Sequence, residues 1–307
     1  MRRVVIKLSV LLGLIMITCI IIEHMLRHIP NDYTLKAEYL NEHSDSIEVL
    51  FLGGSHSVSG LNPELMRMRS FNAANFSQSL EYDLAILKKY ENNWSGLRYI
   101  VIPVSVPSLH IDLENSVEKW RAKNYILYFN IKISKNPKYY AEILNGLLFK
   151  NILDIYYYYA DGTDHIRCTE LGWVKEENNG ASENILATGK EAALRHTNID
   201  DEHFGMMNGA LNSILEFAEY HDITIILFTP PAYKSYTDNL SLESWIKTQQ
   251  LINETVRDHS NCYYYDLMFD ESYSEKHFFD GDHLNSSGAV ILTSFIDSIT
   301  FSISSKF

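Results

Sequence analysis

The hydrophobic positions of the chain follow two patterns. Val4–Ile22 is almost continuously apolar, whereas the later apolar runs are short and alternate with stretches in which apolar residues recur every three or four positions. Short apolar runs predict buried strands, and the three-to-four spacing predicts helices with one apolar face. Such alternation favours a parallel sheet with helices on both faces. The predicted strands are Ile47–Leu52, Tyr99–Ile102, Ile223–Thr229 and Tyr263–Tyr265, and the predicted helices are Leu80–Glu91, Met206–Tyr220, Leu242–Arg257 and Ser286–Ser298.

The first 30 residues predict a membrane anchor. The apolar run over residues 4–22 is long enough to cross the hydrocarbon layer of a bilayer, which is about 30 Å thick. Arg2, Arg3 and Lys7 stand at its start, which predicts a cytoplasmic N-terminus and export of everything after about residue 30. A cleaved signal peptide is the alternative, but Ile20–His24 contains no small-residue cleavage site, so an uncleaved signal anchor is favoured. Residues 31–307 then form an extracytoplasmic domain.

The periodic pattern is lost between about residues 110 and 202. This region is rich in Tyr, Asn and Lys and includes four consecutive tyrosines, Tyr156–Tyr159. We interpret it as a partly helical insertion in the 31–307 domain and as a candidate roof over an active site. Its tyrosines could stack on sugar rings, but aromatic stripes more often serve ordinary packing, which is the favoured interpretation.

Charge and cysteine content argue against several classes of function. The formal net charge is −13 and the sequence has no basic stripe, so nucleic acid is not an expected partner. Cys19 lies in the predicted anchor, whereas Cys168 and Cys262 could pair or stay free after export. The sequence has no clustered His/Cys spacing, and the acidic residues between Asp266 and Asp282 fix no coordination spacing. We therefore predict no metal and no cofactor.

Two short segments at opposite ends of the chain carry candidate chemistry. Gly53-Gly54-Ser55 follows a predicted strand, so the serine would be exposed on a turn at the end of that strand. Asp280 and His283 lie three residues apart, just before the last predicted helix. A serine hydroxyl is a poor nucleophile until an imidazole accepts its proton, and a carboxylate usually orients that imidazole. Each segment alone could be a plain turn, but together they favour a catalytic triad.

This arrangement resembles the SGNH/GDSL hydrolase superfamily, and the resemblance spans almost all of residues 31–307. In that family a Gly-Asp-Ser block follows the first strand, and this chain matches it with Gly54 in place of the acidic residue. Asp280 and His283 fall on the family's catalytic Asp and His. The resemblance implies a three-layer, flavodoxin-like α/β fold with Ser55 as the nucleophile.

The resemblance also implies an oxyanion hole, with two departures. The family's second block supplies a glycine N–H where this chain has Ser77, and a backbone N–H survives that change. The third block supplies an Asn side chain where this chain has Ser105, whose hydroxyl could donate instead. The expected donors are therefore the backbone of Ser55 and Ser77 and the side chain of Ser105. Third blocks that contain proline, as this one does, are typical of members that modify extracytoplasmic polysaccharides or take part in teichoic-acid D-alanylation.

Two further residues are candidates for contact with substrate. His56 follows the proposed nucleophile, and Thr229 ends a predicted strand at the sheet edge where α/β folds bind their ligands. A surface position is at least as compatible with His56. Asp282, beside His283, receives no chemical role.

Together these residues predict a membrane-anchored serine esterase or O-acyltransferase that works outside the cytoplasmic membrane through an acyl-Ser55 intermediate. The expected substrate is an acyl ester of a cell-envelope or surface polysaccharide or of a teichoic-type polymer. A membrane O-acyltransferase is a candidate partner, and hydrolysis and transfer both stay open. The alternative is a catalytically inactive scaffold component of an envelope polysaccharide machine. A Ser55 Oγ out of hydrogen-bond reach of His283 would favour that alternative.

Overall fold

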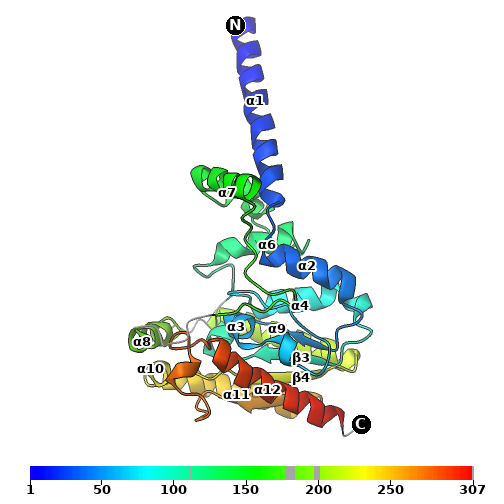
Figure 1. The fold of residues 1–307 in the computed structure, drawn as a ribbon, viewed down its shortest axis with the longest axis vertical. Helices are drawn as coiled ribbons and strands as arrows, with labels where there is room; N and C mark the ends of the chain where they lie inside the picture. The colour runs from blue at the N-terminus through cyan, green and yellow to red at the C-terminus, as the bar shows by residue number, and fades with distance from the viewer. Residues whose placement is uncertain (111, 177–183, 197–200, 306–307) are drawn as a thin grey trace. The chain divides into compact units, whose positions relative to one another are not determined.

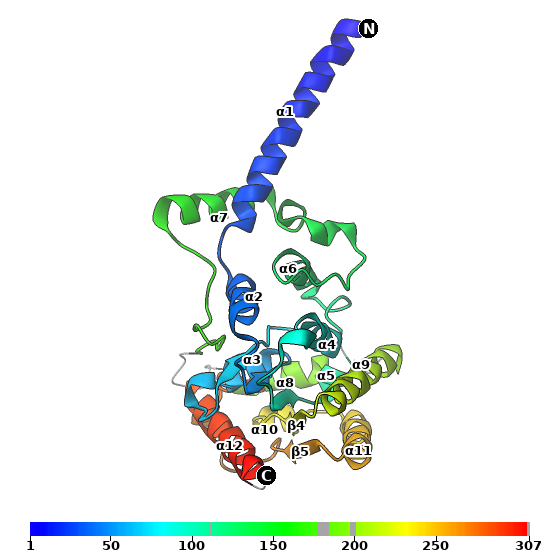
Figure 2. The same ribbon diagram turned by 90° about the vertical axis from the view of Figure 1, so that its right-hand side faces the viewer.

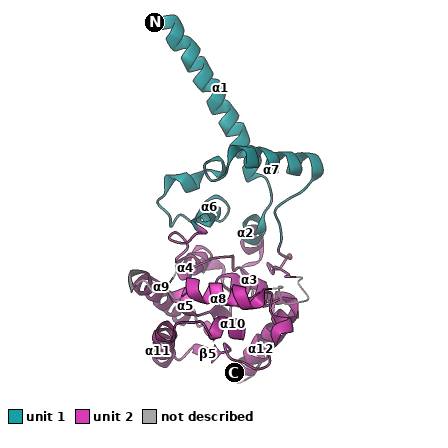
Figure 3. Ribbon diagram, turned by 90° about the vertical axis from the view of Figure 1, so that its left-hand side faces the viewer, with its two compact units in different colours: residues 1–37, 119–167 teal, residues 38–118, 168–307 magenta. Residues whose placement is uncertain are grey.

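The computed structural model describes residues 1–110, 112–176, 184–196 and 201–305. The chain forms two compact units (Figure 3). The first unit contains Met1–Ala37 and Lys119–Arg167, and the second contains Glu38–Glu118 and Cys168–Phe307. The region interpreted from the sequence as an insertion at about 110–202 is therefore divided, because its central part belongs to the first unit with the N-terminal residues.

The second unit is built on a five-stranded parallel sheet with the strand order β2-β1-β3-β4-β5. Its strands are β1 (Val49–Phe51), β2 (Ser70–Asn72), β3 (Tyr99–Pro103), β4 (Thr224–Thr229) and β5 (Cys262–Asp266). The prediction of an α/β fold with a parallel sheet is confirmed, and the strand order is the flavodoxin-like one. The sequence does not predict β2 as a strand, because three residues are too few to show a pattern.

Helices cover both faces of this sheet (Figure 2). On one face α3 (Ser55–Gly60) packs against α12 (Ser286–Ser304), and on the other α9 (Asp201–Tyr220) packs against α4 (Leu80–Lys89) and α5 (Val106–His110). The four predicted helices are present with small shifts of their ends. The other α-helices in the described part of this unit are α8 (Ile185–Arg195), α10 (Lys234–Thr237) and α11 (Leu242–Asp258). Helix α2 (Asp32–His43) begins in the first unit and ends in the second.

The first unit contains α1 (Arg2–Arg27), α6 (Ala122–Leu127) and α7 (Leu148–Asp161), which Figure 1 shows in blue and green. Two helices in the described part of the chain are long and apolar enough to cross a membrane, α1 and α12. They differ in burial, since no part of the apolar window of α1 is buried and 44% of that of α12 is. Leu292 and Ile296 of α12 are core residues of the second unit. Therefore α12 is a core helix, and α1 is the candidate signal sequence or anchor.

The cysteines and tyrosines that the sequence singles out differ in their burial. Cys168 and Cys262 are both buried and free. Tyr156, Tyr157 and Tyr159 each expose about half of their surface, with fractions of 59%, 48% and 52%. About half of each of these side chains is therefore uncovered in the structure.

The turn after β1 depends on Gly53. Its φ of +102° lies where side chains other than glycine's are strained. A Cβ on this residue would lie 2.6 Å from Cδ of Pro103, at the end of β3. The backbone N–H of Gly53 donates a hydrogen bond to Oδ1 of Asp83, at 2.8 Å. Gly53 therefore lets the chain turn close to β3 and lead directly into α3.

Replacing Gly53 by alanine is expected to lower the free energy of unfolding by roughly 1–3 kcal/mol, because the new methyl group adds a steric clash to a strained backbone. Urea unfolding followed by fluorescence measures this loss. Gly205→Ala is the matched control, since its added Cβ in α9 would meet nothing within 4 Å. If both variants unfold at the same urea concentration, the turn does not depend on glycine.

Candidate active site

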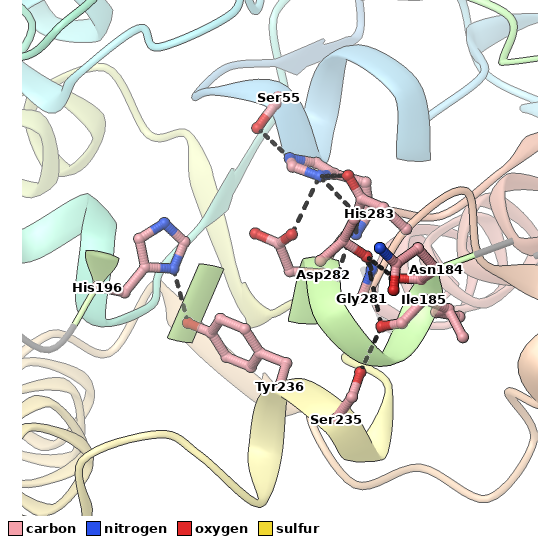
Figure 4. Close-up of polar contacts among 11 residues, drawn as sticks. Ser55, Asn184, Ile185, His196, Ser235, Tyr236, Gly281, Asp282 and His283 are labelled. Carbon is pink, nitrogen blue, oxygen red and sulfur yellow. Dashed lines mark hydrogen bonds and ion pairs between the residues drawn. The ribbon is translucent and has the colours of Figure 1, made fainter. Parts of the chain in front are cut away.

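Ser55 is the first residue of α3 and meets His283 from the other end of the chain. Its Oγ lies 2.7 Å from Nε2 of His283, although 228 residues separate the two positions (Figure 4). The parallel sheet explains the meeting, because β1 and β5 end at the same edge and the chain continues from β1 into α3 and from β5 towards the loop before α12. Both side chains are partly buried. The hydroxyl is therefore placed to give its proton to a neutral imidazole.

Asp280 faces the opposite side of the His283 ring. Nδ1 of His283 lies 3.0 Å from Oδ1 and 3.1 Å from Oδ2 of Asp280. Oδ1 of Asp280 also accepts the backbone N–H groups of His283 at 2.8 Å and of Asp282 at 3.1 Å. The carboxylate therefore fixes both the ring and the backbone of the loop that carries it. The structure thus brings together Ser55, His283 and Asp280 in the order that serine catalysis requires.

Asp282, to which the sequence analysis assigned no role, also lies against His283. Its Oδ1 is 3.3 Å from Nδ1 of His283, and its side chain is only 5% exposed. Burial lowers the pKa of His283, but the negative charge of Asp282 and the hydrogen bond to Asp280 outweigh burial and raise that pKa well above 6.5. Burial alone would raise the pKa of Asp282, yet the nearby His283 charge holds it below its usual range. Two carboxylates therefore stabilise the protonated imidazole.

Two further histidines lie close to these carboxylates. The ring of His56 stacks on that of His283, with centroids 5.0 Å apart and planes 21° apart. His196 follows α8, and its Nδ1 lies 3.0 Å from the hydroxyl oxygen of Tyr236 (Figure 4). Removal from water lowers the pKa of His56 and of His196 to about 4. Both rings are therefore neutral at physiological pH, so His56, a predicted substrate contact, is a neutral stacking partner of His283.

The loop that carries His283 is held by a close contact with α8. A Cβ on Gly281 would lie 2.1 Å from Cα of Gly189, and a Cβ on Gly189 would lie 2.1 Å from Oγ of Ser235, so neither glycine leaves room for a side chain. Oγ1 of Thr188 accepts the Gly281 N–H at 3.2 Å, and Ser235 Oγ donates to the Ile185 carbonyl at 2.7 Å (Figure 4). This contact explains how His196 reaches the site from a part of the chain that shows no catalytic motif.

The metal-binding capacity of the site is limited by hydrogen bonds. Ligand atoms of His56, Asp282 and His283 lie within 4.8 Å of one another, and this is the only such group of three or more in the described residues. However, Ser55 occupies Nε2 of His283, and carboxylates occupy Nδ1. An ion on this group would have to displace one of those partners.

The expected oxyanion donors lie on the loops beside Ser55. Ser77 has a φ of +59°, a left-handed conformation typical of glycine, at the position where the resemblance expects glycine. Among the described residues, the backbone N–H groups of Ser55 and Ser77 meet no acceptor. The two loops are neighbours, since a Cβ on Gly54 would lie 3.5 Å from the Gln78 carbonyl oxygen. Both amides are therefore free to donate to a substrate oxygen.

Ser105 and Thr229 both follow or end central strands, with different surroundings. Ser105 comes after β3, is buried, and its backbone N–H donates to Oγ of Ser108 at 2.7 Å. Thr229 at the end of β4 is completely buried, and its Oγ1 donates to the Val104 carbonyl at 2.9 Å and lies 2.7 Å from the Tyr264 hydroxyl. The Thr229 side chain therefore joins β4 to β5 and to the residue that follows β3, and it is not exposed at the edge of the sheet.

A buried polar network that the sequence analysis missed supports the nucleophile loop. Oδ1 of Asp83 in α4 accepts the Gly53 N–H at 2.8 Å and Nε2 of Gln78 at 2.5 Å, and Oε1 of Gln78 accepts Nδ2 of Asn75 at 2.9 Å. Burial raises the pKa of Asp83 to about 7. In the sequence Asp83 looks like an ordinary acidic residue in the first turn of a helix, so nothing there signals this role.

Comparison with known proteins gives only distant structural similarity. The chain matches no family model and no curated protein. A solved structure of a protein assigned as a platelet activating factor from Streptococcus pneumonia is 12% identical, with a TM-score of 0.42, and 95% of this chain and 98% of that one are covered. A GDSL-like lipase from Bacteroides thetaiotaomicron VPI-5482 is 12% identical, with a TM-score of 0.41 and coverage of 88% and 99%. A protein assigned as an acylhydrolase from Bacteroides fragilis NCTC 9343 is 13% identical, with a TM-score of 0.38 and coverage of 86% and 95%. Similarity at this level assigns no chemistry to the chain, so the side chains of the site have to carry any functional conclusion.

Proposed function

We propose that this protein is an SGNH/GDSL-type serine hydrolase that acts on acyl esters. The observation that carries the proposal is the 2.7 Å separation between Ser55 Oγ and His283 Nε2, with Asp280 bonded to the other ring nitrogen. A nucleophile, a base and an orienting carboxylate in one line are the parts that acyl transfer needs. The same separation argues against the inactive scaffold, which has no use for this contact.

The reaction begins when neutral His283 takes the Ser55 proton and Oγ forms a bond to the ester carbonyl carbon. The carbonyl oxygen becomes an oxyanion, and the N–H groups of Ser55 and Ser77, which meet no acceptor in the described residues, are the donors we propose for it. Protonated His283 then gives its proton to the leaving alcohol as the C–O bond breaks, which leaves an acyl-Ser55 ester. Water or another hydroxyl then attacks this ester while His283 accepts its proton. The bond between the acyl carbon and Oγ breaks, and His283 returns the proton to Oγ, which restores both Ser55 and neutral His283.

The substrate that fits this proposal is an acyl ester of a cell-envelope or surface polysaccharide or teichoic-type polymer. Support comes from α1, which is apolar on all sides and unburied over its membrane-length window. We place residues 4–22 across the cytoplasmic membrane with the N-terminus inside, which leaves the Ser55 site outside. A tethered enzyme meets a surface polymer at high effective concentration. A membrane O-acyltransferase is the proposed partner if the acyl group is transferred.

A fluorophosphonate probe tests the proposal. It phosphonylates a serine only when a base activates the hydroxyl, so mass spectrometry of the labelled full-length protein is expected to find the adduct on Ser55. Ser57→Ala is the matched control, because Ser57 lies in the same helix and its buried Oγ has no hydrogen-bond partner in the described part of the chain. This control should label like the wild type, and Ser55→Ala should not label. Equal labelling of both variants would end the proposal.

A further inference from the structure

The helix α7 has its apolar and polar faces the opposite way round from a helix of a soluble protein. Lys150, Asn151 and Asp154 on its polar face line a cavity of about 530 Å³ inside the first unit, and Asn151 is only 6% exposed. The opposite face is apolar and points outward. Its exposed residues, together with the two leucines that precede the helix, each have between 48% and 79% of their surface open: Leu144, Leu147, Leu148, Phe149, Ile152, Tyr156 and Tyr159.

The spacing of these residues shows that the exposure is a continuous stripe. Within α7, the positions 148, 149, 152, 156 and 159 fall within an arc of about 100° on a helix of 3.6 residues per turn. A surface helix normally turns such a stripe towards the core. An apolar stripe that faces outward, with a polar face directed inward, is the pattern of an element whose outer surroundings are apolar.

Hydrogen bonds attach this element to the C-terminal end of α1, within the same unit. The carboxylate of Glu23 accepts the backbone N–H groups of Glu142 at 3.0 Å and Ile143 at 2.9 Å, in the short helix η5 (Glu142–Leu144) that precedes α7. Tyr159 of α7 donates to the carbonyl of Met25 at 3.4 Å. Figure 1 shows α7 beside the end of α1, from which it extends to one side. The apolar stripe therefore begins where the apolar helix α1 ends.

We infer that α7 and the preceding leucines lie in the interface of the phospholipid bilayer that α1 crosses. Amphipathic helices of this kind bury their apolar face at the boundary between headgroups and acyl chains, and tyrosines are enriched at that depth. The inference rests on the proposed anchor but not on the serine chemistry. Its consequence is that the first unit is held at the membrane surface by a second element in addition to α1.

A bilayer fits the stripe better than a second copy of the chain. Continuity with α1 supplies the reason, since the helix that ends beside η5 is itself exposed and apolar over a length that spans a membrane. In the second unit, Phe269 is a comparably exposed aromatic residue, at 64% against 72% for Phe149, and it lies in a turn after β5 and not on a helix. Phe269 therefore offers a matched reference for an aromatic side chain in water.

Spin labels on single cysteines test the inference in the full-length protein. The Cys19→Ser chain, whose other cysteines are buried, is the background, and Phe149→Cys and Leu147→Cys are the two reporters. Leu12→Cys in α1 reports on the anchor, and Phe269→Cys is the aqueous reference. The protein is placed in nanodiscs of phosphatidylcholine and phosphatidylglycerol, and collision of each label with oxygen and with a water-soluble nickel chelate is measured. Oxygen enters lipid and the nickel chelate does not.

We expect the oxygen-to-nickel collision ratio to be several-fold higher at Phe149 and Leu147 than at Phe269, and higher still at Leu12. A ratio at Phe149 equal to that at Phe269 would place the stripe in water and overturn the inference. Protection of Phe149 from both reagents would place it under a second copy and overturn it as well. In either case a high oxygen-to-nickel collision ratio at Leu12 would still support α1 as a membrane anchor. Hydrolysis of a soluble aryl ester, measured on the same samples, reports separately on Ser55.

Discussion

Alanine at Ser55 is expected to reduce ester hydrolysis by roughly 10⁴-fold or more, and alanine at His283 by a similar factor. Either change removes the pair in which Oγ and Nε2 are 2.7 Å apart, so no covalent intermediate forms efficiently. Residues that act as one unit have non-additive effects. The double variant should therefore be no slower than either single variant. The measurement is kcat/KM for a soluble aryl ester.

Ser57→Ala is the control for this experiment as well, since it changes a serine of the same helix whose Oγ bonds to nothing in the described part of the chain. It should keep wild-type turnover. If the losses from Ser55→Ala and His283→Ala instead multiplied in the double variant, the two residues would not act as one catalytic unit. Near-normal turnover by the Ser55→Ala variant would exclude Ser55 as the nucleophile.

Asparagine at Asp280 is expected to lower kcat/KM by up to roughly 10⁴-fold, as loss of the orienting charge does in other serine triads. An amide at this position can turn its NH₂ group towards Nδ1, which favours the wrong tautomer of His283. The hydrogen bonds that Oδ1 accepts from the backbone of residues 282 and 283 can persist with an amide oxygen, so the loop should keep its shape. Circular dichroism and thermal unfolding check that the fold is retained.

Asparagine at Asp282 is expected to move the pH dependence. His283 must be neutral to accept the Ser55 proton, and its pKa is raised well above 6.5, chiefly by the charge of Asp282. Wild-type kcat/KM should therefore rise with pH through a limb that lies above pH 6.5. Removing the Asp282 charge lowers the pKa of His283, so the limb should shift towards lower pH. If the rising part of the pH profile does not shift, the Asp282 charge does not act on His283. If activity is lost in Asp282→Asn and little is lost in Asp280→Asn, Asp282 and not Asp280 is the carboxylate that orients His283.

The sequence predicts Ser55, Asp280 and His283 because each stands at a recognisable boundary. Ser55 follows a glycine turn after an apolar strand, and the other two precede the last helix. The supporting residues have no such marker. Asp282 lies in an irregular loop, where alternation does not tell which way a side chain points. His196 follows α8, whose Gly189 packs against Gly281 in the loop that carries His283, and no local sequence pattern marks that contact.

Some elements of the fold are predictable from the sequence and others are not. The strands with long apolar runs are predictable, because burial on both faces of a parallel sheet demands continuous hydrophobic residues. The position of 119–167 in a unit with the N-terminal residues is not predictable, because it depends on contacts with α1 rather than on any local pattern. The amphipathic stripe of α7 becomes visible only once the bounds of the helix are known, because residues from about 110 to 202 show no regular periodicity in the sequence. The sequence favours packing for these tyrosines only through the general rule that aromatic stripes more often serve packing.

The pairing of Ser55 with a base 228 residues later has a consequence for biogenesis. A ribosome-bound or partly translocated polypeptide already displays the nucleophile turn, yet it has no imidazole to activate it. The protein would become able to hydrolyse an ester only after the last helix has packed on the sheet, late in maturation. Premature termination anywhere before residue 283 would accordingly yield a catalytically silent product, even with the N-terminal helix and most of the sheet intact.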